Sequence, residues 1–256
     1  MDNLQFSQNE KMFYCNLQNN PKTETEDRKA PEEDKIVEFW SGIWGTEVQH
    51  NKENSWLSTI QRETEGIQDM KHGSIKKEEL RTVLKKLHNW KSPGLDKVQN
   101  VWYKKFYAMH DNLMQCLNQC IQTPQLIPDF ITQGITYMKF KKGNSEDPAN
   151  YRPIVCLPTI YKILTACIAT AITQHCQINN IIAEEQKGCR KKAYGCKEQL
   201  VIDQVIMENA RKSNKKITTA YVDYQKAYDS VPHSWLIEIL KIYKIEDQMI
   251  NCLRIL

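Results

Sequence analysis

The residue best suited to chemistry in this sequence is Asp223, near its C-terminal end, and a second aspartate, Asp229, follows it in a turn. Asp223 follows residues 217–222, a β-branched and aromatic run that predicts a strand, so its carboxylate should stand exposed at the end of a rigid element. Such a carboxylate can bind Mg²⁺, which takes oxygen ligands and needs only one or two protein carboxylates beside phosphate oxygens. The alternative is a turn and a helix cap, which is the commoner use of a strand-end Asp followed by a turn Asp.

The sequence around these aspartates, residues 221–233, resembles the first catalytic motif of reverse transcriptases from non-LTR retrotransposons. That motif has an aromatic residue, the aspartate, a Lys-Ala pair, a second aromatic residue, Asp-Ser-Val and a His. Further blocks resemble the same family and come in its order, at residues 90–96, 150–164 and 185–190. Four ordered blocks between about residues 75 and 245 are more specific than any one of them.

The resemblance implies an α+β fold, with a mostly helical fingers region and an incomplete palm of a right-hand polymerase. Polar composition predicts a disordered arm at residues 1–32, and apolar residues at helical spacing predict an N-terminal helical extension at 33–74. The fingers would follow at 75–215, and 216–256 would be a partial palm that carries the first catalytic motif. On this interpretation the chain is a truncated RNA-directed DNA polymerase.

The resemblance also assigns roles to individual side chains. Asp223 matches the carboxylate that binds both catalytic Mg²⁺ ions, and Tyr228 matches the aromatic residue beneath the sugar of the incoming deoxynucleoside triphosphate. Arg152 and Lys141 match fingers cations that contact the triphosphate, a role that suits the planar, permanently charged arginine fork. Two alternatives remain at this point. Arg152 could pair with Glu146 or Asp147, and Tyr228 could be an ordinary core residue.

The polar loop at residues 184–194 is expected to contact the RNA template and the DNA primer. Gln186 and Gly188 resemble a family block near these strands. The loop also supplies four cations that could contact phosphates, Lys187, Arg190, Lys191 and Lys192.

One part of the catalytic apparatus does not occur in the sequence. Two-metal phosphoryl transfer needs a second carboxylate group, which this family supplies as an Asp-Asp pair later in the palm. No two aspartates are adjacent anywhere in the 256 residues. The sequence therefore predicts a fragment that is inactive by itself as a polymerase. The alternatives are a non-catalytic module that binds single-stranded RNA or DNA, and a retroelement remnant without function.

Charge, cysteine spacing and hydropathy exclude several classes of protein for this sequence. Residues 1–70 carry a net charge of −7 and residues 71–256 a net charge of +11, so a polyanion should bind the second part. Nine cysteines at irregular spacing, with no C-x-x-C pair, argue against a disulfide framework and a common zinc module. No apolar run is long enough to span a membrane, and the first residues lack the features of a secretory signal. We expect an intracellular protein, cytoplasmic or nuclear, whose oligomeric state the sequence leaves open.

Periodicity and turn residues predict the elements that position these groups. Strands are expected at 131–140, 151–157 and 217–222. The predicted amphipathic or apolar helices cover residues 32–45, 74–87, 98–121, 159–182, 196–211 and 232–243. Ser74 is the candidate cap of the second helix, and Cys116 and Cys120 are candidate core thiols of the third. Trp40 and Trp44 share a helix face and should pack on the body of the fold.

Overall fold

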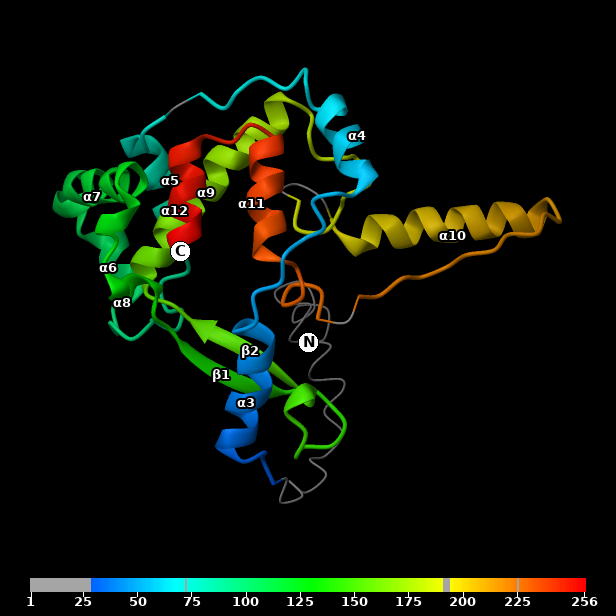
Figure 1. Ribbon diagram of the computed structural model, residues 1–256, viewed down its shortest axis with the longest axis horizontal. Coiled ribbons are helices and arrows are strands. Elements are labelled where there is room, and N and C mark those ends of the chain that lie inside the picture. Colours follow the sequence, from blue (N-terminus) through cyan, green and yellow to red (C-terminus); the bar gives the residue numbers. More distant parts are fainter. Residues whose placement is uncertain (1–28, 72, 191–193, 225) are drawn as a thin grey trace, which may run out of the picture. The chain divides into compact units, whose positions relative to one another are not determined.

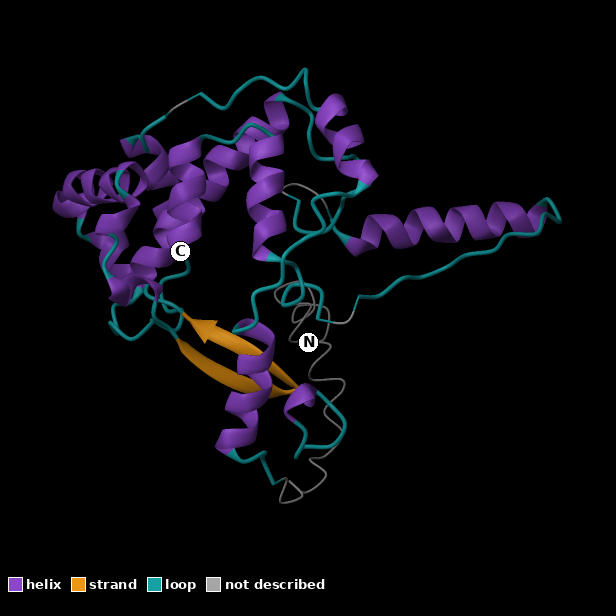
Figure 2. Cartoon of the chain, in the orientation of Figure 1, coloured by secondary structure: helices purple, strands orange, loops and turns teal. Residues whose placement is uncertain are grey.

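The computed structural model describes residues 29–71, 73–190, 194–224 and 226–256 (Figure 1). Helices dominate the described chain, and one two-stranded sheet is formed by β1 (Ile135–Phe140) and β2 (Tyr151–Cys156) (Figure 2). The chain divides into two compact units, and the division crosses both strands. The predicted arm falls almost wholly outside the described residues.

The first unit contains helix α3 (Glu33–Trp44) and the half of the sheet formed by residues 138–154. Helix α3 ends where predicted, and the backbone N–H of Gly45 donates to the Ser41 carbonyl. Trp40 is only 4% exposed, and its ring centroid lies 4.9 Å from that of Trp44. The predicted packing role is therefore confirmed for Trp40, whereas Trp44 is 45% exposed and contacts the Trp40 ring from the surface.

The second unit holds the remaining helices. The first five are α4 (Ser55–Glu63), α5 (Lys77–Lys86), α6 (Asn100–Lys105), α7 (His110–Gln122) and α8 (Asp129–Thr132). The others are α9 (Thr159–Ile178), α10 (Cys196–Lys212), α11 (His233–Ile242) and α12 (Asp247–Ile255). No described helix is long and apolar enough to cross a membrane.

The core of this unit lies between α5, α7, α9 and α12. Each helix contributes a fully buried apolar side chain, Leu80, Leu117, Ile163 and Ile250 among them. In α9 the apolar residues recur at helical spacing, so Ile163, Cys167 and their neighbours form one stripe that faces α5. Burial of each such side chain stabilises the fold by about 1.5–3 kcal/mol.

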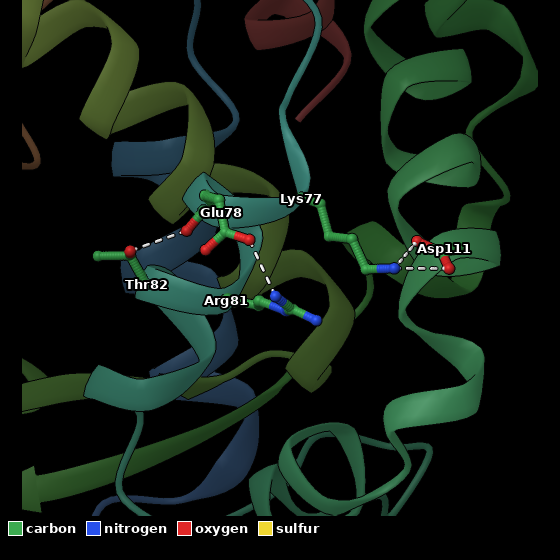
Figure 3. Close-up of polar contacts among 5 residues, drawn as sticks. All are labelled: Lys77, Glu78, Arg81, Thr82 and Asp111. Atoms are coloured by element: carbon green, nitrogen blue, oxygen red, sulfur yellow. Dashed lines mark hydrogen bonds and ion pairs between the residues drawn. The ribbon is translucent and has the colours of Figure 1, made fainter.

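Helix α5 begins one turn later than predicted, at Lys77, and Ser74 does not cap it. The backbone N–H of Lys76 instead donates to Glu79 Oε2 at 3.0 Å, which is half of a capping box. The ammonium of Lys77 lies 2.6 Å from Asp111 Oδ1 and so joins α5 to α7 (Figure 3).

The single helix predicted for residues 98–121 is wrong, because the chain leaves helical geometry at Phe106 (φ −81°, ψ 71°). A 3₁₀ turn, Tyr107–Met109, follows before α7 begins. Buried His110 stabilises the break, since its Nε2 lies 2.8 Å from the Tyr103 carbonyl at the end of α6. The thiols in α7 are also less buried than predicted. Cys116 is exposed and Cys120 is half-buried.

Helix α11, which follows the segment around Asp223, is held at both ends. The Oγ of Ser234 accepts a hydrogen bond from the backbone N–H of His50 at 3.0 Å, and this contact fixes the first turn of α11. Near its end, Nε2 of buried His175 in α9 donates to the Tyr243 carbonyl at 2.7 Å.

The strand predicted at residues 217–222 is not a strand in the structure. The segment runs without regular structure after α10, and the side chain of Tyr221 donates a hydrogen bond to Asp203 of that helix. A strand needs a partner that accepts its backbone bonds, and among the described residues only β1 and β2 pair.

Candidate functional site

Two of the sequence blocks meet in the second unit. Residues 90–96 form a turn that packs on the start of α9, so closely that a Cβ on Gly94 would lie 2.3 Å from the Pro158 nitrogen. The Thr159 hydroxyl donates to the Val98 carbonyl at 2.7 Å, and the Lys162 ammonium donates to the Ser92 carbonyl at 3.0 Å. The close packing at Gly94 and these two hydrogen bonds therefore fix the turn against the start of α9.

The polar loop at residues 183–190 is held by its own side chains. The amide of Gln186 donates to the Gly188 carbonyl at 3.0 Å, and Arg190 donates to the Ala183 carbonyl at 3.0 Å. Lys187 lies 3.3 Å from Glu198 of α10, so its charge already has a carboxylate partner. Of the four predicted phosphate contacts, Lys191 and Lys192 lie outside the described residues.

Glu198 organises the end of this loop, and the sequence analysis did not single it out. One carboxylate oxygen accepts the Tyr194 backbone N–H at 2.9 Å and the other faces Lys187. These contacts lower the pKa of Glu198 below the ordinary carboxyl value. No spacing rule links a lysine to a glutamate across a loop of this length, so the pair left no signal in the sequence.

The segment that carries Asp223 ends in a tight turn before α11. Lys226 has a positive φ of 49°, and its carbonyl accepts the backbone N–H groups of Asp229 and Ser230. Asp223 is exposed, and Tyr228 is 89% exposed. The core alternative for Tyr228 is therefore wrong.

Tyr228 contacts the polar loop directly. Its hydroxyl lies 3.9 Å from Sγ of Cys189, the residue after Gly188. The hydrogen bond with this thiol raises the pKa of Tyr228 above the ordinary phenol value. Two sequence blocks almost forty residues apart are thus adjacent here, although no motif or spacing pointed to Cys189.

Lys141 and Arg152 belong to the first unit, where they follow β1 and lie within β2. Both side chains are exposed. In the described part of the chain no ion pair joins Arg152 to Glu146 or Asp147. Glu146 pairs with Lys29, and Asp147 accepts the Ala149 backbone N–H. The structure therefore gives no support to the ion-pair alternative for Arg152.

Carboxylates are sparse around Asp223. Across residues 29–71, 73–190, 194–224 and 226–256, no three His, Cys, Asp or Glu side chains come together as a potential metal-binding group. Asp223 offers one carboxylate, whereas two bound divalent ions require carboxylates on more than one side. The described residues thus do not fit a two-Mg²⁺ site.

Comparison with known protein families identifies the segment that contains these groups. The profile of the family described as "Reverse transcriptase (RNA-dependent DNA polymerase)" matches residues 140–255. This segment belongs to the reverse transcriptase family. The match includes the strand with Arg152, the polar loop and the Asp223 motif, so the resemblance noted from the sequence blocks is confirmed.

Three transposon proteins are similar to this chain, and two of them are named as probable RNA-directed DNA polymerases. The chain is 30% identical over 158 residues to "Probable RNA-directed DNA polymerase from transposon X-element" of Drosophila melanogaster. It is 26% identical over 168 residues to "Probable RNA-directed DNA polymerase from transposon BS" of the same organism. It is also 24% identical over 183 residues to "Transposon TX1 uncharacterized 149 kDa protein" of Xenopus laevis. These alignments cover 60%, 65% and 69% of this chain, respectively, but only 17%, 18% and 13% of the relatives.

Proposed function

We propose that the chain provides the fingers and the first part of the palm of a non-LTR retrotransposon RNA-directed DNA polymerase. We further propose that these 256 residues bind nucleic acid without polymerising. The observation that carries both statements is the state of Asp223. It lies within the matched segment, yet among the described residues it belongs to no group of three or more His, Cys, Asp or Glu side chains that could hold a metal ion. A single carboxylate cannot hold two divalent ions against a triphosphate.

Four side chains have roles in this proposal. Asp223 contributes one oxygen ligand to Mg²⁺ in the complete enzyme, and Tyr228 lies beneath the sugar of the deoxynucleoside triphosphate. Arg152 and Lys141 contact the triphosphate. The exposure of all four side chains supports these roles, since each is free to meet a ligand from solvent.

Binding of a template and primer, or of any single strand, does not require the second carboxylate. The excess of cations after residue 70 supports this part of the proposal. Arg190 and Gln186 would present the polar loop to the strand, while Glu198 limits what Lys187 can contribute.

The test is primer extension on an RNA template with Mg²⁺, compared between the 256-residue chain and a chimera that adds the remaining palm and thumb of a relative. We expect extension by the chimera alone, and loss of that activity in Asp223→Ala. In the same chimera Tyr228→Ala should admit ribonucleotides, whereas Tyr228→Phe should exclude them as before. Template-dependent extension by the 256-residue chain that Asp223→Ala abolishes would refute the proposal.

A further inference from the structure

A basic pocket lies at the C-terminal end of α5, in the second unit, and includes Trp90 and Lys91 at the start of the turn formed by residues 90–96. Its volume is about 630 Å³, within the usual range of ligand pockets. The pocket is lined by Lys85, Lys86, Leu87, His88, Asn89, Trp90, Lys91 and Lys104. Four of these residues are lysines and none carries a carboxylate, so the pocket favours an anion.

A second pocket of about 330 Å³ continues the basic surface along α6, because Lys85 and Lys104 line both. It adds Lys105 and Arg81 to the positive charge. The only carboxylate in its lining is Glu78, which lies 2.9 Å from Arg81 and neutralises that one cation (Figure 3). Within the described residues no ion pair engages Lys85, Lys86, Lys91 or Lys105.

Exposed aromatic rings lie among these cations. Trp90 is 73% exposed, and Tyr107, in the lining of the second pocket, is 68% exposed. The ring of Trp102 in α6 stacks on that of Phe106, the residue after this helix, at 5.4 Å, and both side chains are about half exposed. A surface meant only for solvation would not need large rings, whereas bases stack on such rings whatever their sequence.

The backbone beneath this surface is rigid. The Lys104 ammonium donates to the Leu87 carbonyl at 2.8 Å and caps the end of α5. Buried Asn100 donates to the His88 carbonyl at 2.7 Å. Trp90 therefore projects from a fixed platform, and binding would order little of the chain.

We propose that the α5–α6 patch, defined as Lys85, Lys86, Trp90, Lys91, Lys104 and Lys105, binds a single strand of nucleic acid. The free lysines contact phosphates and Trp90 stacks on a base. This inference rests on the proposed function and adds a second binding surface to it, because the patch shares no residue with the Asp223 motif or the polar loop. An acidic protein or an anionic membrane would use the same charges, but neither would stack an aromatic ring on a base.

The experiment titrates the 256-residue chain with a fluorescein-labelled oligothymidylate about 10 nucleotides long, at several salt concentrations. Lys85→Gln/Lys86→Gln should flatten the slope of log K against log salt by about 1.4, since each lost phosphate contact removes about 0.7. Lys215→Gln/Lys216→Gln removes the same charge from the turn after α10 and should leave the slope unchanged. Circular dichroism verifies that each variant is folded.

Stacking is tested separately. Trp90→Ala should weaken binding about 5- to 150-fold, the range measured for loss of one base stack, while Trp90→Phe should retain most of the affinity. Binding of polyglutamate or of phosphatidylserine vesicles with equal affinity, together with no effect of Trp90→Ala, would overturn the inference.

The variant Arg190→Gln distinguishes a failure of the patch inference from a failure of the proposed role of the polar loop. If this variant lowers affinity and the patch variants do not, the patch inference fails while the proposed role of the polar loop stands. The opposite pattern would support the patch and contradict the loop.

Discussion

A Cβ at Gly94 would lie 2.3 Å from the backbone nitrogen of Pro158 and 2.7 Å from its Cα. The contact joins the turn at residues 90–96 to the start of α9, and both partners are backbone atoms that cannot rotate aside. The Asp223 motif and the polar loop lie elsewhere, so this glycine serves the fold of the second unit rather than the chemistry of those groups.

We expect Gly94→Ala to destabilise the second unit by about 1–3 kcal/mol, the usual cost of forcing an extra carbon into a packed site. Urea unfolding followed by circular dichroism measures the effect. Gly66→Ala is the matched control, because nothing lies within 4 Å of its added Cβ. Equal stability of the two variants would show that the turn can move away from Pro158.

Glu198→Gln should strengthen binding of a single strand through the polar loop. The substitution removes the carboxylate that faces Lys187, so the ammonium can turn to a phosphate and the salt slope should steepen by about 0.7. Glu208→Gln removes an equal charge from the same helix, beside Lys212, and should leave the slope unchanged. A flatter slope in Glu198→Gln would instead mean that Glu198 holds the loop in its binding shape.

Burial should protect two thiols from alkylation. Burial raises the pKa of Cys167 and of Cys252 to about 11, so at pH 8 only about one molecule in a thousand carries either thiolate. Iodoacetamide should label exposed Cys189 and Cys196 first, and the buried pair only after denaturation. Mass spectrometry of the labelled peptides measures the order. Early labelling of Cys252 would mean that α12 detaches from the core.

The ion pair between Lys77 and Asp111 should make stability depend on pH at the acid end. The hydrogen bond with Lys77 lowers the pKa of Asp111 in the folded chain, so its contribution is present above the ordinary carboxyl pKa. The contribution disappears as the pH falls through the lowered value. The midpoint temperature of thermal unfolding of Asp111→Asn should therefore be slightly lower than that of the wild type at neutral pH. In strong acid the two midpoints should coincide.

A double-mutant cycle with Lys77→Met controls for the loss of Asp111 alone. Because both side chains are largely exposed, the coupling should be small and should decrease in high salt. Coupling that persists at all pH values would contradict an electrostatic origin.

Periodicity predicted α3, α9, α10 and α11 to within a few residues, because each has an apolar stripe or an unambiguous turn at its end. It failed at Phe106, because the apolar spacing continues although the helix breaks there. Buried His110 stabilises the break through its contact with the Tyr103 carbonyl, which apolar periodicity does not reveal. It failed again at residues 217–222, whose β-branched composition indicates a strand only when a partner strand is present. Helices α4, α8 and α12 were not predicted, and the strand predicted at 131–140 begins only at Ile135, because residues 131 and 132 lie in α8.

The candidate site likewise contains some residues that sequence motifs select and others that only three-dimensional contacts reveal. Motif order alone selected Asp223, Tyr228 and Arg152, and the family match covers all three. Cys189 and Glu198 could not be selected, since their roles depend on contacts between segments that the sequence does not place side by side. The predicted domain boundaries and the assigned roles of the site residues stay predictions.

The irregular segment after α10 has a consequence for amide hydrogen exchange. No backbone hydrogen bond within the described residues involves 217–224, so their N–H groups should exchange with deuterium within seconds, far faster than those of α9. A polypeptide that paired as a strand with this segment would slow exchange across residues 217–224. Deuterium uptake there therefore reports strand pairing, even when no nucleotide is added.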